Sequence, residues 1–135
     1  MSLEIGQRQR EGILVLDLSG RITVGEEASA LRGKLREAAA GGAREFVLNL
    51  QEVDYIDSTG LGALVVCFTS LQKQGGRLKL ENLNRRNIEL LVLTKLTTIF
   101  EVFNDEQDAV NSFFPDREIK RFDILSFVKE QGAEG

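Results

Sequence analysis

The sequence predicts an α/β fold with a mixed sheet of about five strands, about four helices and a short C-terminal extension. Two strand-like segments flank a Glu11-Gly12 turn near the N-terminus, which indicates an antiparallel hairpin. Strand-like and helix-like segments then alternate, a pattern typical of parallel strands joined by crossover helices. Residues 46–50 form a nearly unbroken apolar segment, as expected of a strand that is covered on both faces.

The N-terminal third should contain the hairpin and one helix. We expect an edge strand over residues 3–9 and a second strand over 13–18, ended by Ser19-Gly20. A helix should follow over about 26–40, and Gly41-Gly42 should end it. Its inner face is defined by apolar residues at helical spacing, namely Ala28, Leu31, Leu35 and either Ala38 or Ala39.

The central third should contain a buried strand, a loop and a helix. The strand covers residues 46–50, and Val53 and Ile56 continue its apolar character across a short turn. Asp57 is suited to cap a helix that opens at Ser58 and ends before Gly75-Gly76. The apolar residues of this segment lie three and four positions apart, at Leu61, Leu64, Val65, Phe68 and Leu71.

The last third repeats the alternation. We expect a strand over residues 77–80, a helix capped within 82–84, and a final strand over 99–103. Asp105 should cap a last helix whose apolar residues face inward, namely Ala109, Val110, Phe113 and Phe114.

The single proline, Pro115, falls where the resemblance described below ends, and that resemblance implies a domain of residues 1–114 followed by an extension of residues 115–135. Asp123 could cap a short helix in the extension. The apolar side chains there, such as Phe122 and Phe127, have three destinations: their own domain, a neighbouring subunit, or a surface where a partner would dock.

Composition excludes several functions. The net charge of −4 argues against a nucleic-acid-binding protein, which needs clustered Lys and Arg. The N-terminus lacks the order of a signal peptide, and no apolar segment approaches the roughly 20 residues that span a bilayer. We therefore expect a cytoplasmic chain that binds no membrane. The one cysteine, Cys67, is interpreted as a core residue.

The sequence also argues against an enzyme and predicts no cofactor. It contains no histidine, which removes Ser-His-Asp and Cys-His machinery and most zinc sites. It contains no P-loop motif. Asp54 and Asp57 could form a paired carboxylate or cation site, but no further acidic residues follow at regular spacing. Arg85-Arg86 could bind an anion, but two arginines in the first turn of a helix are more often solvated.

The residues after Asp57 suggest a modifiable surface. Ser58 lies in the first turn of the predicted helix, where backbone N–H groups lack partners and the helix dipole favours negative charge. A phosphate on Ser58 would therefore be tolerated by the fold. Gly60 and Gly62 should leave the start of the helix bare. The alternative is an ordinary helix start in which Asp57 caps and Ser58 has no special role.

The segment DYIDSTGLGALV, residues 54–65, resembles the signature loop of the STAS domain family, and in particular the bacterial anti-sigma factor antagonists. The likeness extends from about residue 3 to 114. It implies that Ser58 is phosphorylated, and that Ser58 forms a partner-binding surface together with Asp57, Thr59, Gly60, Leu61 and Gly62. By position in the family, Asp17 and Thr23 are further candidates for this surface; the alternative is that they are an ordinary edge residue and an ordinary turn residue.

The resemblance also implies the partners. An anti-sigma factor serine kinase, similar to histidine-kinase ATPase domains, would bind the unmodified protein, free a sigma factor and then phosphorylate Ser58. A serine phosphatase would reverse the modification. Two alternative functions stay open: a scaffold module of a stress-signalling or lipid-transport complex, and an enzyme or nucleotide-binding protein. The chain could also form a homodimer.

Overall fold

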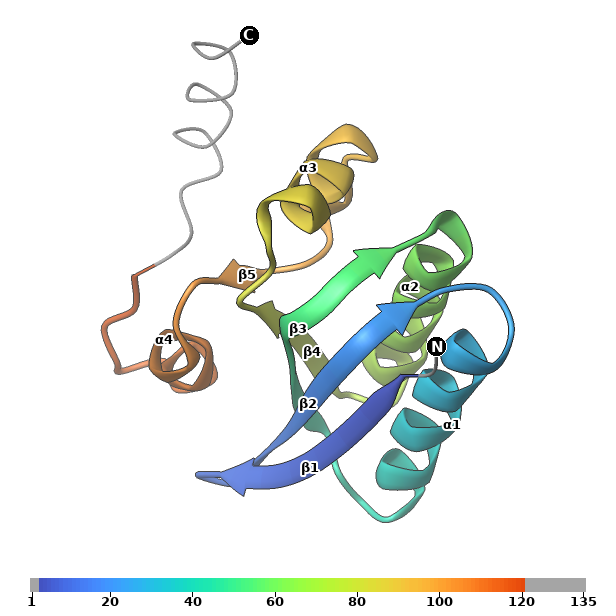
Figure 1. The fold of residues 1–135 in the computed structure, drawn as a ribbon. Coiled ribbons are helices and arrows are strands. Elements are labelled where there is room, and N and C mark those ends of the chain that lie inside the picture. Colours follow the sequence, from blue (N-terminus) through green and yellow to red (C-terminus); the bar gives the residue numbers. More distant parts are fainter. Residues whose placement is uncertain (1–2, 121–135) are drawn as a thin grey trace, which may run out of the picture.

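The computed structural model describes residues 3–120, which form one five-stranded sheet with helices on both faces (Figure 1). The spatial order of the strands follows the chain, β1-β2-β3-β4-β5, and only β1 and β2 are antiparallel. The predicted mixed α/β fold is therefore confirmed. The strands are β1 (Glu4–Arg10), β2 (Ile13–Ile22), β3 (Glu45–Ile56), β4 (Arg77–Glu81) and β5 (Val102–Phe103). The helices are α1 (Glu26–Ala40), α2 (Ser58–Lys73), α3 (Arg85–Leu93), the 3₁₀ turn η1 (Leu96–Thr98) and α4 (Glu106–Asn111).

The predicted N-terminal hairpin is confirmed. Arg10 pairs with Ile13, so only Glu11 and Gly12 form the turn. Both have positive φ, 53° and 84°, as a type I′ turn requires. Glycine adopts this conformation without strain at the second position.

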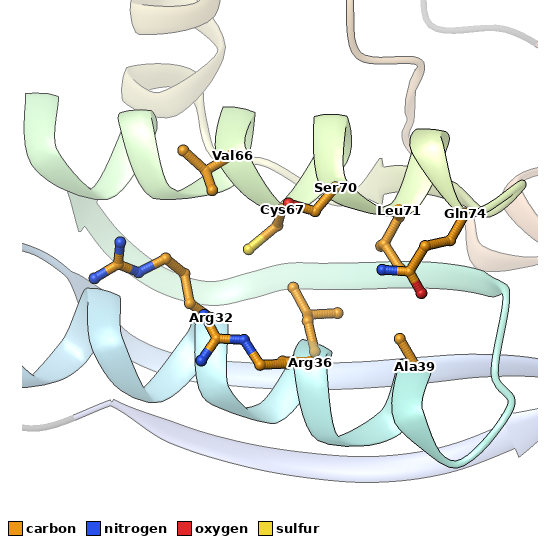
Figure 2. Close-up of a pocket in the computed structure, with 9 residues that line it drawn as sticks. Arg32, Arg36, Ala39, Val66, Cys67, Ser70, Leu71 and Gln74 are labelled. Atoms are coloured by element: carbon orange, nitrogen blue, oxygen red, sulfur yellow. The ribbon is translucent and has the colours of Figure 1, made fainter.

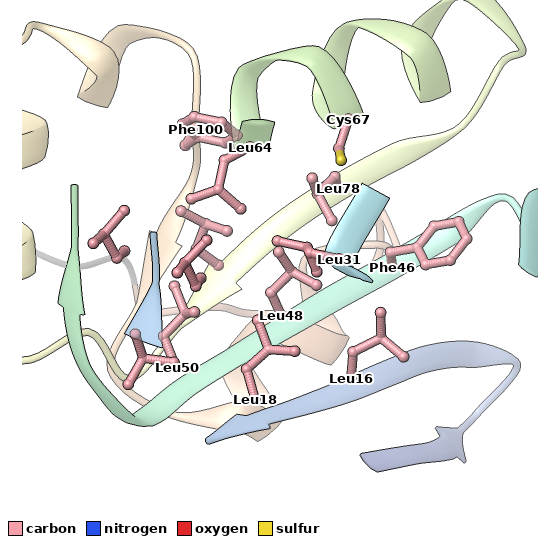
Figure 3. Packing of buried hydrophobic residues seen from close by; sticks show 14 of the residues in the cluster. Leu16, Leu18, Leu31, Phe46, Leu48, Leu50, Leu64, Cys67, Leu78 and Phe100 are labelled. Atoms are coloured by element: carbon pink, nitrogen blue, oxygen red, sulfur yellow. The ribbon is translucent and has the colours of Figure 1, made fainter. Parts of the chain in front are cut away.

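The main core lies between the sheet and the pair α1 and α2 (Figure 3). The face of α1 that was predicted to be buried is buried, and its residues Leu31, Leu35 and Ala39 pack in this core. Leu16 and Leu48 alternate inward from β2 and β3, and Cys67 fills space beneath α2 with its thiol buried. Cys67 is therefore a packing residue, as the sequence predicted.

Two strands are longer than predicted. Ser19-Gly20 does not end β2, and no turn follows Leu50, because Ser19 to Ile22 pair with Glu52 to Ile56 of β3. The register shifts twice along this stretch, and Gly20 has a φ of 117°. The irregular pairing breaks the two-residue alternation of buried side chains, so the pattern suggested a turn where the strands continue.

The final strand is shorter than predicted. Of residues 99–103, only Val102 and Phe103 belong to β5. Lys95, with a φ of 62°, ends α3, and the N–H groups of Ile99 and Phe100 then donate to the Leu96 carbonyl. Phe100 is buried, but from a turn: its ring meets Phe68 of α2 edge-on at 5.3 Å. Its apolar character reflects core packing rather than strand pairing.

Helix α3 is tied to the end of β3. The Asn84 side chain caps α3 by accepting from the Asn87 N–H at 2.8 Å. The side-chain amides of Asn84 and Asn87 both donate to the Val53 carbonyl. Figure 1 shows α3 beyond the carboxyl ends of the strands, near the start of α2. None of the helices within residues 3–120 is long and apolar enough to cross a membrane.

The opposite face of the sheet carries α4 and a polar cluster, which we define as Arg8, Arg10, Asp17, Glu81 and Glu106. Arg8 bridges Asp17 and Glu106, and Arg10 also contacts Glu106. Glu81 is fully buried, and burial raises its pKa to about 9, with the Glu106 carboxylate adding to the effect. Hydrogen bonds from Arg8 lower the pKa of Glu106 to about 2. Glu81 is thus a neutral acid beside a carboxylate that two arginines hold ionised.

The start of the C-terminal extension packs on this same face. Ile119 joins Phe113 and Phe114 beside the buried side chains of α4. Arg117 pairs with Glu11 of the hairpin turn at 2.7 Å and stacks on Phe114. The proposed boundary at residue 115 stays a prediction, and the expected helix after Asp123 lies outside the described residues.

Candidate functional site

The predicted site is built around Asp57, which connects two segments of the chain. One carboxylate oxygen accepts from the Gly60 N–H at 2.7 Å, which caps α2 as the sequence predicted. The other accepts from the Val24 N–H at 3.0 Å. The Asp57 N–H donates to the Ile22 carbonyl at 3.2 Å. One side chain therefore fixes the start of α2 against the loop that joins β2 to α1.

Ser58 and Thr59, the first two residues of α2, are both exposed. The Ser58 hydroxyl makes no hydrogen bond within residues 3–120. It lies at the end of the helix where the dipole favours negative charge. The Ser58 side chain is therefore accessible to another protein, and the fold of the domain does not depend on its hydroxyl group.

The two glycines near Ser58 have different roles, and the prediction that both leave the helix bare is wrong for Gly60. Gly60 is buried, and a methyl group there would lie 1.9 Å from the Ile22 carbonyl oxygen. Its missing side chain lets α2 pack against the backbone of β2. Gly62 is exposed, and a methyl group there would meet no atom of residues 3–120 within 4 Å. Only Gly62 leaves a bare surface.

The structure brings some of the predicted surface residues together and separates others. Thr23 lies in the loop that Asp57 holds, and its carbonyl accepts from the Ala28 N–H. Leu61 is 6% exposed and packs in the main core. Asp17 belongs to the polar cluster on the other face of the sheet, where it pairs with Arg8 at 2.7 Å. Its role in partner binding stays a prediction.

Two aliphatic side chains enlarge the surface beyond the predicted residues. Val24 is 66% exposed, directly beside the Asp57 bridge. Val66 is 50% exposed on α2, two turns after Ser58. The helical positions 58, 62 and 66 lie on one face, so the sequence contained the signal for Val66. No comparable pattern pointed to Val24, because its exposure depends on how Asp57 holds the loop.

We define the switch surface as Val24, Ser58, Thr59, Gly62 and Val66. Within residues 3–120, no group of three or more His, Cys, Asp or Glu residues is placed to hold a metal ion. One hollow of the described chain lies between α1 and α2 and shares Val66 with this surface, and another lies beside β4; neither is lined by Asp57 or Ser58. The exposed aliphatic and hydroxyl groups of the switch surface suit contact with another protein.

The fold and this loop define the class of protein. The family model of the STAS domain matches residues 4–109, so the chain belongs to the STAS domain family. Within it, the chain is 40% identical over 110 residues to the anti-sigma-B factor antagonist of Bacillus subtilis (strain 168), covering 82% of this chain and 99% of that protein.

Two solved structures have the same fold. An anti-sigma factor antagonist from Mycobacterium paratuberculosis superposes with a TM-score of 0.70 at 22% identity, covering 82% of this chain and 92% of that one. The Bacillus cell fate determinant SpoIIAA in its phosphorylated form gives a TM-score of 0.64 at 18% identity, covering 82% of this chain and 99% of that one. The predicted family and fold are therefore confirmed.

Proposed function

We propose that this protein is an anti-sigma factor antagonist controlled by phosphorylation of Ser58. The unmodified switch surface binds an anti-sigma factor that is also a serine kinase, and this binding frees a sigma factor. The kinase transfers phosphate from ATP to Ser58 and then dissociates, and a serine phosphatase restores the binding form. The protein is the substrate in this scheme, so it needs no catalytic base of its own.

The exposure of the Ser58 hydroxyl is the observation that supports the proposal most directly. A kinase must bring this oxygen to the γ-phosphate of ATP, and no part of residues 3–120 hydrogen-bonds it. Support also comes from the relatives, because the Bacillus subtilis protein is named for antagonism of an anti-sigma factor. The SpoIIAA structure is that of a phosphorylated form.

The switch surface also supplies a reason for release. A phosphate adds a charge of about −1.5 to −2. It would stand next to Asp57 in the chain, on a surface that also exposes the aliphatic side chains of Val24 and Val66. A partner that covers this surface would have to desolvate the added charge. The fold itself tolerates the charge at the start of α2, so modification changes the binding and leaves the domain intact.

The experiment is phosphotransfer from ATP by each anti-sigma factor kinase of the source genome, beginning with any that is encoded beside this gene. We expect one kinase to label the wild-type chain at a single site. Ser58→Ala should abolish the label, and Thr59→Ala, which removes the adjacent exposed hydroxyl, should retain it. Ser58→Ala should also bind the kinase without being released when ATP is added.

Three results would contradict the proposal. Label that persists in Ser58→Ala would place the modification elsewhere. Equal affinity of the kinase for Ser58→Asp and the wild type would show that negative charge at this position does not cause release. Capture of transporter or scaffold subunits without any kinase would favour the alternative of an interaction module that needs no phosphorylation.

A further inference from the structure

A groove between α1 and α2 lies next to the switch surface and has no role in the proposed function so far. It encloses about 150 Å³. Figure 2 shows Arg32 extending from α1 into the space below α2 and Arg36 lying along α1, while Cys67 points from α2 towards α1. Leu35 and Leu71 add an apolar floor. The groove therefore combines a buried apolar base with two cationic groups at its edge.

The two arginines have no partner within the domain. Neither guanidinium makes a hydrogen bond or an ion pair with any residue between 3 and 120. They stand four positions apart on α1, where like charges repel. Other arginines of the described chain, such as Arg8 and Arg117, are paired with carboxylates. The groove is thus an unneutralised positive site on a chain whose net charge is −4.

The groove continues the surface that begins at Ser58. Positions 58, 62, 66 and 70 lie on one face of α2 at intervals of four residues. All four are exposed, and Val66 and Ser70 also line the groove. A protein seated on Ser58 and extending along α2 therefore reaches Arg32 and Arg36 without crossing another element of the fold.

We infer that this groove binds an acidic segment of the partner kinase and helps to select which kinase binds. This inference rests on the proposed function. Carboxylates of the segment would pair with the arginines, and an apolar side chain would cover Val66 and the floor. Matching of charge suppresses binding of partners that present basic residues there.

The chemistry of the groove makes an acidic protein segment a better occupant than its alternatives. Nucleic acid would meet only two cations on an otherwise acidic chain. Covalent capture by the thiol is disfavoured, because burial raises the pKa of Cys67 to about 11 and the residue is 6% exposed. A protein segment uses both the charge and the apolar floor.

The test compares three charge reversals on the same helix: Arg32→Glu, Arg36→Glu and the control Lys34→Glu. Each changes the net charge by the same amount, and Lys34 does not line the groove. The probe is the kinase found in the phosphotransfer experiment, with affinity measured by isothermal titration calorimetry without ATP. Urea unfolding of each variant establishes that it is folded.

We expect each arginine variant to bind about tenfold or more weakly, and Lys34→Glu to bind within about twofold of the wild type. Added salt should weaken the wild type more than the arginine variants. Equal binding by all four proteins would overturn the inference and leave the proposed function standing. Failure of every kinase to bind the wild type would remove the proposed function, and the inference would fall with it.

Discussion

The contrast between Gly60 and Gly62 gives the most direct test of how α2 is placed. Both are interior residues of the same helix, two positions apart. An added methyl group at Gly60 would lie 1.9 Å from the Ile22 oxygen and 2.6 Å from its carbonyl carbon. These are backbone atoms of β2, so the clash can be relieved only by moving α2 away from the sheet. The same change at Gly62 meets open space.

The two substitutions should change the free energy of unfolding in opposite directions. Replacing a helical glycine by alanine stabilises a helix by about 1 kcal/mol. Gly62→Ala should gain this amount. Gly60→Ala gains it too, but overpacking of a well-packed site costs about 1–3 kcal/mol and occasionally more. Because the clash is with rigid backbone, we expect an overpacking cost at or above the upper end of this range. The free energy of unfolding should therefore fall by about 2 kcal/mol in Gly60→Ala. The two variants should therefore differ by about 3 kcal/mol.

Urea unfolding followed by circular dichroism measures this difference. Gly33→Ala serves as the matched control, because Gly33 is an exposed interior position of α1 whose added methyl group would also meet nothing. It should be stabilised to the same degree as Gly62→Ala. If Gly60→Ala were as stable as Gly62→Ala, α2 would not pack against Ile22 as described. If Gly62→Ala bound the kinase as tightly as Gly33→Ala, the partner would not approach this part of the helix closely.

Three further predictions concern charged groups. Asp57→Ala removes the hydrogen-bond acceptor for the N–H groups of both Gly60 and Val24, so it should lower the free energy of unfolding by about 2 kcal/mol. Asp57→Asn should lower it by about half as much, and urea unfolding measures both changes. Equal stability of Asp57→Ala and the wild type would contradict the Asp57 bridge. Glu81 holds its proton in the folded state up to about pH 9, whereas the unfolded carboxyl loses it near its ordinary pKa of 4.5. The unfolded state therefore binds fewer protons between these values, and stability should fall as pH rises through this window, with a slope of at most about 1.4 kcal/mol per pH unit. Glu81→Gln should flatten that slope, and an unchanged slope in this variant would show that another group titrates. Ser58→Asp should leave the unfolding free energy within about 0.5 kcal/mol of the wild type, because the start of a helix tolerates an acidic group; a larger loss would mean that the added charge acts on the fold and not on binding alone.

The sequence predicted the elements whose signals are local. Helical spacing of apolar residues, the capping residues Asp57 and Asp105, and the capping segment 82–84 correctly indicated the starts of α2, α4 and α3. The Glu11-Gly12 turn was equally clear. These features depend on interactions within a few residues, and a single sequence contains them.

The errors arose where distant segments decide the outcome. The extension of β2 and β3 past Gly20 and Leu50 depends on pairing between strands that are remote in the chain. The role of Gly60 depends on its contact with Ile22, and the aspartate that caps the helix also holds Val24. A sequence pattern indicates that a glycine or an aspartate is present for a reason, but it does not identify the partner across the fold.

The Asp57 bridge has a consequence for the kinetics of recognition. Because one carboxylate holds both the start of α2 and the adjoining loop, the serine and Val24 keep a fixed spacing before any encounter. A visiting kinase would meet a rigid template and lose little entropy in ordering it. Association should then approach the rate set by diffusion and orientation. Under the proposed function, a phosphate on Ser58 would therefore act by shortening the lifetime of the complex.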